Sequence, residues 1–255
     1  MPGPSILYCG DTTLDSAAAY LAGLITRAGW NWSYLPSHLP LTSSHLMDDL
    51  QLVIFSDYPA QQASIELQQQ IVSRVEQGCG LLMLGGWESY FGCGGNWNDT
   101  PIGEVLPVEI ADSDDRQNVD QPVFIRPHQP HPLTDPFPWN TRPPLIGGYN
   151  RFTPKPDGEL LLVADRYQAV RQDGPGRQTI ELSPLWSDPL LVIGRHGTGI
   201  TAAMATDIAP HWVGPLVDWG DSRVSAQAPD APAIEVGNLY ADFFTELLRY
   251  VGRLH

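Results

Sequence analysis

Short apolar runs alternate with amphipathic stretches over the N-terminal part of the chain. The run SILYCGD predicts a buried first strand, and WNWSYLP, LQLVIFSDYPA and GLLMLGG predict three further strands. Residues 14–28 and 61–77 carry apolar side chains at intervals of three and four, which predicts two helices. The inward faces are expected to hold Leu14, Ala18, Leu21, Ile25 and Ala28 in the first helix, and Ile65, Ile71, Val72 and Val75 in the second. This alternation is typical of a parallel sheet with helices on both faces.

The pattern changes after Trp97, where proline and glycine become dense over residues 101–156. Proline fixes φ and lacks an N–H donor, so we expect no long regular structure there. Short strands are expected at PVFIRP and ELLLVAD, and PLLVIGRHGTGITAAMATD predicts a hairpin that turns near residues 196–199. The chain should end in an amphipathic helix whose buried face holds Val236, Tyr240, Phe243, Leu247 and Val251.

The change of pattern leaves one domain or two as alternatives. The later strands need a sheet to join, and the last helix needs a sheet face to cover. We therefore favour a single domain over residues 1–255, with a Pro/Gly-rich insertion at about 97–157.

Composition narrows the class of protein. A chain of 255 residues with 42% apolar and 17% charged residues is typical of a folded globular protein. The formal net charge of −15 disfavours nucleic acid and anionic membranes as partners, although acidity also serves solubility alone. The start MPGPSILYCG lacks the features of a secretion signal, and the chain has three cysteines, so we expect reduced thiols in the cytoplasm.

Three stretches carry a resemblance to a known family. They are EQGCGLLMLGGWESYFGCGGNWNDTPIGEVLPVEI (residues 76–110), HPLTDPFP (131–138) and GRHGTGITAAMATDIAPHW (194–212). They resemble the glutamine amidotransferase-like family of the class I glutamine amidotransferase-like superfamily, and more distantly the trehalose-utilisation-like proteins. The resemblance implies an α/β, flavodoxin-like three-layer sandwich with a mostly parallel sheet and an added antiparallel hairpin. It implies less about chemistry, because one fold hosts many activities.

The resemblance also implies a nucleophile that this chain lacks. Working members carry a Cys at a strand-to-helix elbow, in a Gly-x-Cys-x-Gly pattern, with a His and a Glu two residues apart later in the chain. Here Gly85 stands where the Cys would be, followed by Gly86 and Trp87, and no His-x-Glu pair occurs. Glutamine hydrolysis by the family mechanism is therefore not expected.

Acidic and hydroxyl side chains follow the predicted strands. Asp11, Asp57 and Glu88 come just after strand ends, and Ser89 is adjacent. Ligands of open parallel sheets bind outside the carboxyl ends of the strands, so these residues form a candidate ligand site. The alternative is helix N-capping, which favours the same residue types at the same places and applies most to Asp11.

A second candidate group is DIAPHW, which follows the predicted hairpin. Asp207 is placed to orient the imidazole of His211, and Trp212 is adjacent. The alternative is a structural network that holds a proline-containing loop. A single His with unaligned carboxylates does not predict a metal, so no metal and no cofactor are expected.

Two further features have simpler interpretations. Cys93, in FGCGGNW, is either a relocated nucleophile or a loop cysteine without a chemical role. Aromatic residues gather in the loops, where they either stack on a ligand or partner or pack the loops onto the sheet. The acidic stretch ADSDDRQNVD is expected to be a solvated turn.

Three functions remain open. In the first, the chain is a non-glutaminase binder of a small polar ligand, similar to a sugar or an amide, at a site formed by Gly85, Gly86, Trp87, Ser89, Asp57, Asp11 and Trp212. In the second, it is a hydrolase-type enzyme that uses His211 with Asp207 or Glu88. In the third, aromatic loops bind a partner or a second copy of the chain, which also makes a homo-oligomer an expectation.

Overall fold

The computed structural model describes residues 5–174 and 177–255. Its strands and helices alternate in the first half of the chain, and long strands follow. The strands are β1 (Ile6–Gly10), β2 (Trp32–Leu35), β3 (Leu52–Ser56), β4 (Gly80–Leu84), β5 (Val108–Ile110), β6 (Arg116–Pro127), β7 (Leu145–Asn150), β8 (Phe152–Pro154), β9 (Glu159–Gly174), β10 (Arg177–His196), β11 (Gly199–Met204), β12 (Arg223–Ala226) and β13 (Ile234–Gly237). The helices are α1 (Ala18–Arg27), α2 (Ile65–Glu76), α3 (Pro101–Val105), α4 (Pro210–Val217) and α5 (Asn238–Gly252).

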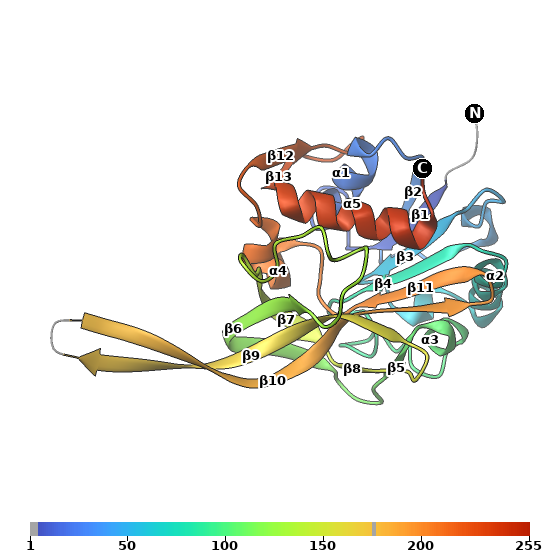
Figure 1. The fold of residues 1–255 in the computed structure, drawn as a ribbon. Helices are drawn as coiled ribbons and strands as arrows, with labels where there is room; N and C mark the ends of the chain where they lie inside the picture. The colour runs from blue at the N-terminus through green and yellow to red at the C-terminus, as the bar shows by residue number, and fades with distance from the viewer. Residues whose placement is uncertain (1–4, 175–176) are drawn as a thin grey trace.

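Within the described residues, one sheet of nine strands runs through the molecule in the order β2-β1-β3-β4-β11-β10-β9-β6-β7 (Figure 1). The neighbours from β2 to β11 pair in parallel. From β11 to β7 every pairing is antiparallel. The protein therefore has a mixed α/β fold around a large sheet with a parallel core, as expected for its first half.

The parallel core forms where the sequence has its apolar runs. Every residue of β1, β3 and β4 is buried, as is typical of parallel strands covered on both sides. Helix α5 packs over β3, β4 and β11, while α2 contacts β11 and α3. No helix of the described residues has the length and apolarity that a membrane crossing requires.

The predicted helices are confirmed, with corrected ends. Helix α1 begins at Ala18 rather than near Leu14, because the preceding residues form turns. Helix α2 begins at Ile65, where the Ser64 hydroxyl accepts a hydrogen bond from the Leu67 N–H as its N-cap. The inward placement of Ile65 is wrong, since its side chain lies in the first turn and is 49% exposed.

The Pro/Gly-rich region contains more regular structure than expected. Strand β6 extends over residues 116–127, well beyond the short strand expected at PVFIRP. Its pairing with β7 shifts register between Asn118 and Val123, an interval that includes Pro122. A proline is tolerated at such an irregularity because no ladder hydrogen bond is needed from its nitrogen. Proline density therefore predicted the irregularity but not the strand around it.

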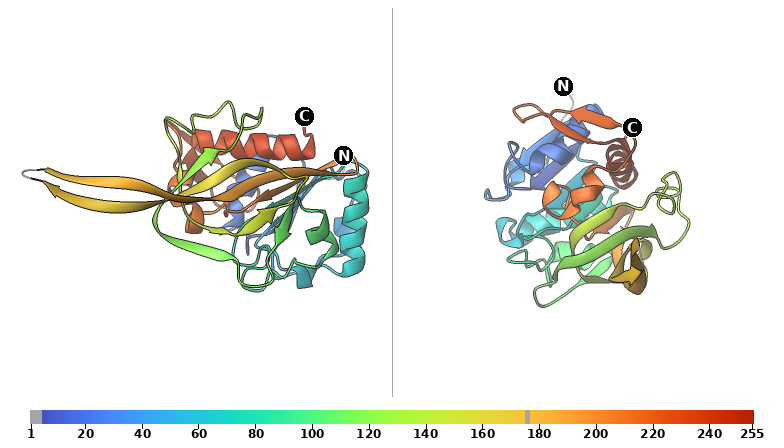
Figure 2. Two further views of the ribbon diagram at one scale, coloured as in Figure 1. Left: turned by 60° about the horizontal axis from the view of Figure 1, so that its bottom comes forward. Right: turned by 90° about the vertical axis from the view of Figure 1, so that its left-hand side faces the viewer.

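The hairpin predicted around residues 196–199 is confirmed by the pairing of β10 with β11, which closes with His196 opposite Gly199. Beyond the sheet, β9 and β10 continue as a two-stranded ribbon that projects from the body (Figure 2). We call residues 166–174 and 177–186 of this ribbon the arm. The sequence analysis predicted only the short strand ELLLVAD and the hairpin that follows Pro189 in this part of the chain, so it missed the arm.

The last helix has the expected buried face, with Tyr240, Phe243, Leu247 and Val251 all buried in α5. Val236 is also buried, but it belongs to β13 rather than to the helix. Most of the aromatic residues that the sequence places in loops are buried as well, in agreement with a packing role; they are Tyr90, Trp97, Trp139, Trp219 and also Trp212, which lies in α4.

Candidate functional site

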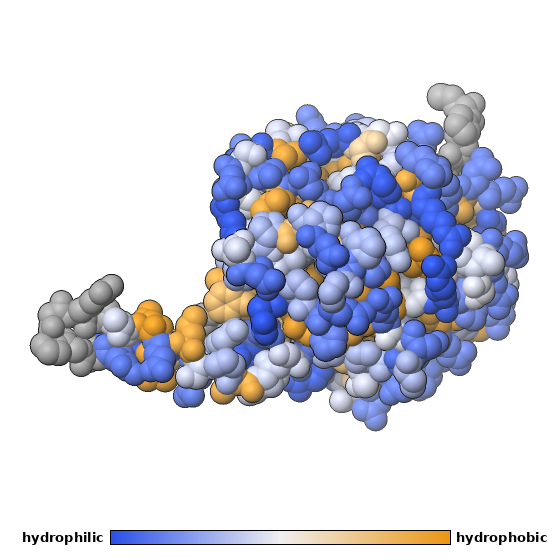
Figure 3. Space-filling view, in the orientation of Figure 1, coloured by the Kyte–Doolittle hydropathy of each residue, from blue (hydrophilic) through white to orange (hydrophobic). Residues whose placement is uncertain are grey.

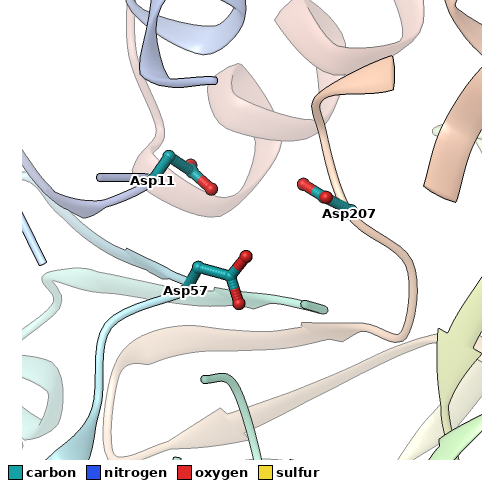
Figure 4. A group of neighbouring side chains, drawn as sticks. All are labelled: Asp11, Asp57 and Asp207. Atoms are coloured by element: carbon teal, nitrogen blue, oxygen red, sulfur yellow. The ribbon is translucent and has the colours of Figure 1, made fainter. Parts of the chain in front are cut away.

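Three carboxyl groups meet at the carboxyl edge of the parallel strands. Asp11 directly follows β1, Asp57 directly follows β3, and Asp207 lies shortly after β11. One oxygen of each lies within 4.8 Å of the others (Figure 4). We call these three residues the aspartate cluster. Because β1, β3 and β11 run in the same direction, their ends lie at one edge of the sheet.

Left-handed turns end the two strands that carry Asp11 and Asp57. Their φ angles are +50° and +46°, a conformation that Asp tolerates better than most residues. Just before Asp11, Gly10 has a φ of +133°, and a Cβ there would lie 1.5 Å from the Ser56 carbonyl oxygen. Glycine is therefore required for β1 to end so close to β3, and both carboxyl groups point toward Asp207 (Figure 4).

Gly85 and Gly86 directly follow β4, which lies between β3 and β11 in the sheet. A Cβ on Gly86 would lie 2.1 Å from the Asp57 Oδ1, and a Cβ on Gly85 would lie 2.0 Å from the Ala205 carbonyl oxygen. Two residues without side chains thus let Asp57 and the segment after β11 approach each other across the end of β4. In this turn after β4, the two glycines pack closely against Asp57 and Ala205.

Hydrogen bonds fix two members of the aspartate cluster. The Glu88 N–H donates to the Asp57 Oδ1 at 2.7 Å, and the Asp57 N–H donates to the Ser89 hydroxyl at 3.0 Å. The Asp207 Oδ1 accepts the N–H groups of Ile208 and Ala209. The elbow after β4 therefore orients Asp57, while the backbone that leads into α4 orients Asp207.

Asp11 has a different set of neighbours. The Tyr8 hydroxyl donates to its Oδ2. Its buried Oδ1 has no hydrogen-bond partner within the described chain, and the same is true of the buried Ser56 hydroxyl oxygen. Asp11 does not cap α1, because Ala17 occupies the N-cap position and its side chain makes no cap bond. The capping alternative therefore does not explain this carboxyl group.

Burial raises the pKa of every carboxyl group in the cluster. The pKa of Asp57 rises to about 7 and that of Asp207 to about 6, in both cases first because burial disfavours the charged form. The pKa of Asp11 lies well above its usual range for the same reason, and the charges of Asp207 and Asp57 raise it further. The three groups are thus poor anions on their own, and hydrogen-bond donors or positive charge would stabilise them.

The buried side-chain amide of Asn150 forms hydrogen bonds with the backbone of Gly86. The Asn150 Oδ1 accepts the Gly86 N–H at 2.8 Å, and its Nδ2 donates to the Gly86 carbonyl and to the Asp115 Oδ1. The Asp115 carboxylate also accepts the N–H groups of Phe91 and Gly92. The expectation of a solvated turn is wrong for Asp115, because its side chain is buried under the elbow. Asn150 and Asp115 were missed because their signal is tertiary.

The Trp87 ring contacts two basic side chains, those of His211 and Arg116. Trp87, next to the double glycine, is 46% exposed. Its ring lies 5.6 Å from the His211 ring, and the Arg116 guanidinium carbon lies 4.8 Å from its centroid. The charge of His211 lowers the pKa of Asp207, opposing the larger effect of burial.

The remaining candidates lie in different environments. Glu88 is half-buried, and Cys93 is exposed, with its N–H bonded to the Trp87 carbonyl. Trp212 is buried against Gly148 of β7, and its Nε1 donates to Asn118. The functional roles of Glu88, Cys93 and Trp212 stay predictions. Sequence reasoning did not single out Tyr8 or Ser56, since a hydroxyl inside an apolar run is typical of an ordinary strand.

Comparison with solved structures finds two relatives that match nearly the whole fold. Cytoplasmic Protein STM1381 from Salmonella typhimurium LT2 is 23% identical, with a TM-score of 0.71 over 96% of this chain and 98% of that chain. Cytoplasmic Protein STM3548 from Salmonella typhimurium is 22% identical, with a TM-score of 0.70 over 97% of this chain and 98% of that chain. These likenesses show the fold alone.

A more distant likeness is to a beta-galactosidase from Rahnella sp. R3, at 12% identity and a TM-score of 0.52. It covers 97% of this chain but 31% of that chain. The search of curated proteins gave no match. A family profile described as "Putative glutamine amidotransferase" (GATase1-like) matches residues 10–225, which include the aspartate cluster and the double glycine. The chain therefore belongs to the glutamine amidotransferase-like (GATase1-like) family.

Proposed function

We propose that this chain does not hydrolyse glutamine by the thiol mechanism and instead binds a small polar ligand at the carboxyl edge of its parallel strands. The observation that carries the proposal is the aspartate cluster, with carboxyl groups from three separate strand ends. Buried carboxyl groups accept hydrogen bonds from hydroxyl, amide or amine donors, so a sugar-like or amide-like molecule suits them.

The turn after β4 supports the first part of this proposal, that the chain does not hydrolyse glutamine by the thiol mechanism. The Gly85 Cα faces the Ala205 carbonyl at a distance that leaves no room for a Cβ, and so none for a thiol. A nucleophile at this position would require the end of β4 to move away from the segment after β11. A relocated thiol at Cys93 is the remaining route to thiol chemistry.

An assay of glutamine turnover tests directly whether the chain hydrolyses glutamine. We expect no ammonia release from glutamine by the purified chain, and the same result for Cys93→Ser. Turnover by the wild type that is lost in Cys93→Ser would contradict the proposal, because it would identify Cys93 as a relocated nucleophile.

Ligand binding is tested by thermal stabilisation with a panel of monosaccharides, disaccharides, polyols and carboxamides. A true ligand raises the melting temperature by mass action. We expect at least one compound to stabilise the wild type and the exposed-acid control Asp112→Asn, and to stabilise Asp57→Asn much less. If every compound acts equally on all three proteins, the proposed site is wrong.

A hydrolase that uses His211 with Asp207 or Glu88 is the second candidate function. It is favoured by the charge of His211 acting on Asp207 and by the contact of the His211 ring with Trp87. Hydrolysis of nitrophenyl glycosides and esters tests it. An activity lost in His211→Gln and retained in Asp112→Asn would favour this candidate over simple binding.

Three further expectations accompany this proposal. We propose a cytoplasmic location, supported by the two Salmonella relatives whose names describe them as cytoplasmic. We propose that the helices and sheet form a flavodoxin-like three-layer sandwich, supported by α5 and α2, which both contact β11. A homo-oligomer is supported by the apolar surface that the arm exposes (Figure 3). Ile180 and Trp186 are among its exposed side chains.

A further inference from the structure

We infer that the aspartate cluster is a binding site for one hard divalent cation of the Mg²⁺, Mn²⁺ and Ca²⁺ class. This inference rests on the proposed function, since it names a ligand for the same edge of the sheet. It is carried by the distances between the carboxylate oxygens and by two buried oxygen atoms that lack hydrogen-bond partners.

The spacing of the oxygens fits a single ion. One oxygen from each of Asp11, Asp57 and Asp207 lies within 4.8 Å of the other two. Hard cations bind oxygen at about 2.0–2.6 Å, so two oxygens on one ion lie at most about 5 Å apart. Three oxygens at the 4.8 Å limit would lie about 2.8 Å from their common centre, so small side-chain shifts bring all three onto one ion, and water can fill the remaining coordination positions.

Two neighbouring atoms point to a ligand independently of the cluster's acidity. The Asp11 Oδ1 and the Ser56 hydroxyl oxygen are buried, and neither has a hydrogen-bond partner among the described residues. Ser56 lies opposite Gly10, the residue before Asp11, in the pairing of β1 with β3, and it directly precedes Asp57. Buried polar atoms are nearly always paired in folded proteins, so unpaired oxygens beside converging carboxyl groups indicate a bound partner.

The charges around the cluster make a cation the best partner. The three carboxyl groups lie within 4.8 Å of one another, so their charges repel each other when they are ionised. A divalent cation removes this repulsion, whereas a single shared proton neutralises one group and leaves the others facing each other. A neutral polar ligand supplies donors but no compensating charge.

The ligand set selects the class of metal. Within the described residues, the cluster consists of carboxylates alone, with a serine hydroxyl beside it. Oxygen-only sites suit Mg²⁺, Mn²⁺ and Ca²⁺, while Zn²⁺ and Cu²⁺ favour imidazole or thiolate ligands. The backbone N–H groups of Glu88 and Ile208 hold the Asp57 and Asp207 carboxyl groups in place, so the site is partly preorganised.

The test titrates Mn²⁺ into the EDTA-treated chain at pH 7.5 and follows free Mn²⁺ by electron paramagnetic resonance, with Mg²⁺ and Ca²⁺ as competitors. The variants are Asp57→Asn and Asp207→Asn, because an Asn Oδ1 still accepts the backbone N–H bonds that these residues now receive. Asp112→Asn removes an exposed acid by the same chemical change. The melting temperature without metal shows whether each variant is folded.

We expect one Mn²⁺ per chain for the wild type and for Asp112→Asn, displaced by Mg²⁺ or Ca²⁺. Each cluster variant should bind at least about tenfold more weakly, because it loses one anionic oxygen ligand. The inference is overturned if the wild type binds none of these ions, or if folded Asp57→Asn and Asp207→Asn both bind Mn²⁺ as the wild type does.

The metal titration and the ligand panel fail independently. If EDTA-treated wild type is stabilised by a sugar or carboxamide at the cluster but binds no divalent ion, the proposed function stands and the cation site is wrong. If the ions bind at the cluster and no organic compound stabilises the protein with or without them, the cation site is supported and the small polar ligand is wrong.

Discussion

At the residue scale, the double glycine and the aspartate cluster depend on each other. Gly86 provides the space that the Asp57 carboxyl group occupies, and Gly85 lets the segment around Ala205 approach β4. The same close approach that brings Asp57 toward Asp207 removes the space for a side chain at the elbow. The double glycine is therefore part of the packing around the aspartate cluster.

Placing a cysteine at Gly85 should destabilise the fold rather than create a glutaminase. In Gly85→Cys the new Cβ would lie 2.0 Å from the Ala205 carbonyl oxygen. We expect the free energy of unfolding to fall by about 3 kcal/mol, as for a severe overpacking substitution. Urea denaturation measures it. Gly147→Cys is the matched control, because its Cβ would lie 3.4 Å from the Trp212 carbonyl oxygen, an ordinary contact. An equal loss of stability in both variants would show that the contact with Ala205 is not the cause.

The raised pKa values of the cluster predict a pH dependence of stability. Asp57 has a pKa of about 7 and Asp207 one of about 6 in the folded chain, and burial is the main cause of both. The usual value for Asp in an unfolded chain is about 3.9. Because the folded state holds protons that the unfolded state releases, stability is greatest below the unfolded value and is lost as pH rises through the folded values.

Urea denaturation in EDTA at several pH values between 4 and 8 measures this effect. Each raised group contributes a slope of up to about 1.4 kcal/mol per pH unit. The double variant Asp57→Asn, Asp207→Asn should have a flatter profile than the wild type and than Asp112→Asn. If wild type and double variant have parallel profiles, these two carboxyl groups are not raised as described.

At the scale of elements, the turn between β10 and β11 locks the hairpin onto α2. Gly197 has a φ of +59°, and a Cβ there would lie 2.5 Å from the Glu76 carbonyl oxygen at the end of α2. The Thr198 N–H donates to the same carbonyl at 2.9 Å. The turn therefore helps to position β11, whose carboxyl end leads to Asp207.

A pair of glycine substitutions separates packing from backbone strain at this turn. Gly197→Ala meets both a left-handed φ and the Glu76 backbone, while Gly29→Ala has a φ of +77° with nothing within 4 Å of its Cβ. We expect Gly29→Ala to cost about 1 kcal/mol, the strain term alone, and Gly197→Ala to cost clearly more. Thermal and urea unfolding measure both, and equal costs would show that the contact with α2 has no effect.

At the scale of the whole molecule, the arm stands apart from the body that carries the site (Figure 2). Several of its large apolar side chains are exposed; they are Val170, Ile180, Leu182, Leu185 and Trp186. A two-stranded ribbon has little stability of its own in water. The arm therefore adds little to the stability of the core, and its apolar side chains are exposed to solvent.

Shortening the arm should leave the body folded. Replacement of residues 170–181 by Asn-Gly keeps a hairpin turn and removes the outer ribbon. We expect a melting temperature within about 2 °C of the wild type, because the side chains described at residues 170–172 and 179–181 are all exposed. Sedimentation of both proteins tests the homo-oligomer at the same time: an oligomer lost on shortening supports association through the arm, and monomers in both cases contradict it.

The sequence predicted those parts of the fold in which local pattern and burial coincide. Apolar runs of about five residues marked β1, β3 and β4, because parallel strands covered on both sides need apolar side chains throughout. The hairpin of β10 and β11 was also predictable from its glycine turn. The arm was not predicted, since its apolar side chains are exposed and the pairing of β9 with β10 that forms it is a tertiary feature.

The candidate site divides in the same way. The sequence alone determined that acids follow β1 and β3, that an Asp follows β11, and that glycine occupies the elbow position. Only the tertiary structure decided that Asp11, Asp57 and Asp207 meet within 4.8 Å, that Asp115 and Asn150 are buried beneath the elbow, and that Gly85 faces a backbone carbonyl. The physical reason is that strand order in a sheet brings together residues far apart in the chain, and local pattern does not specify that order.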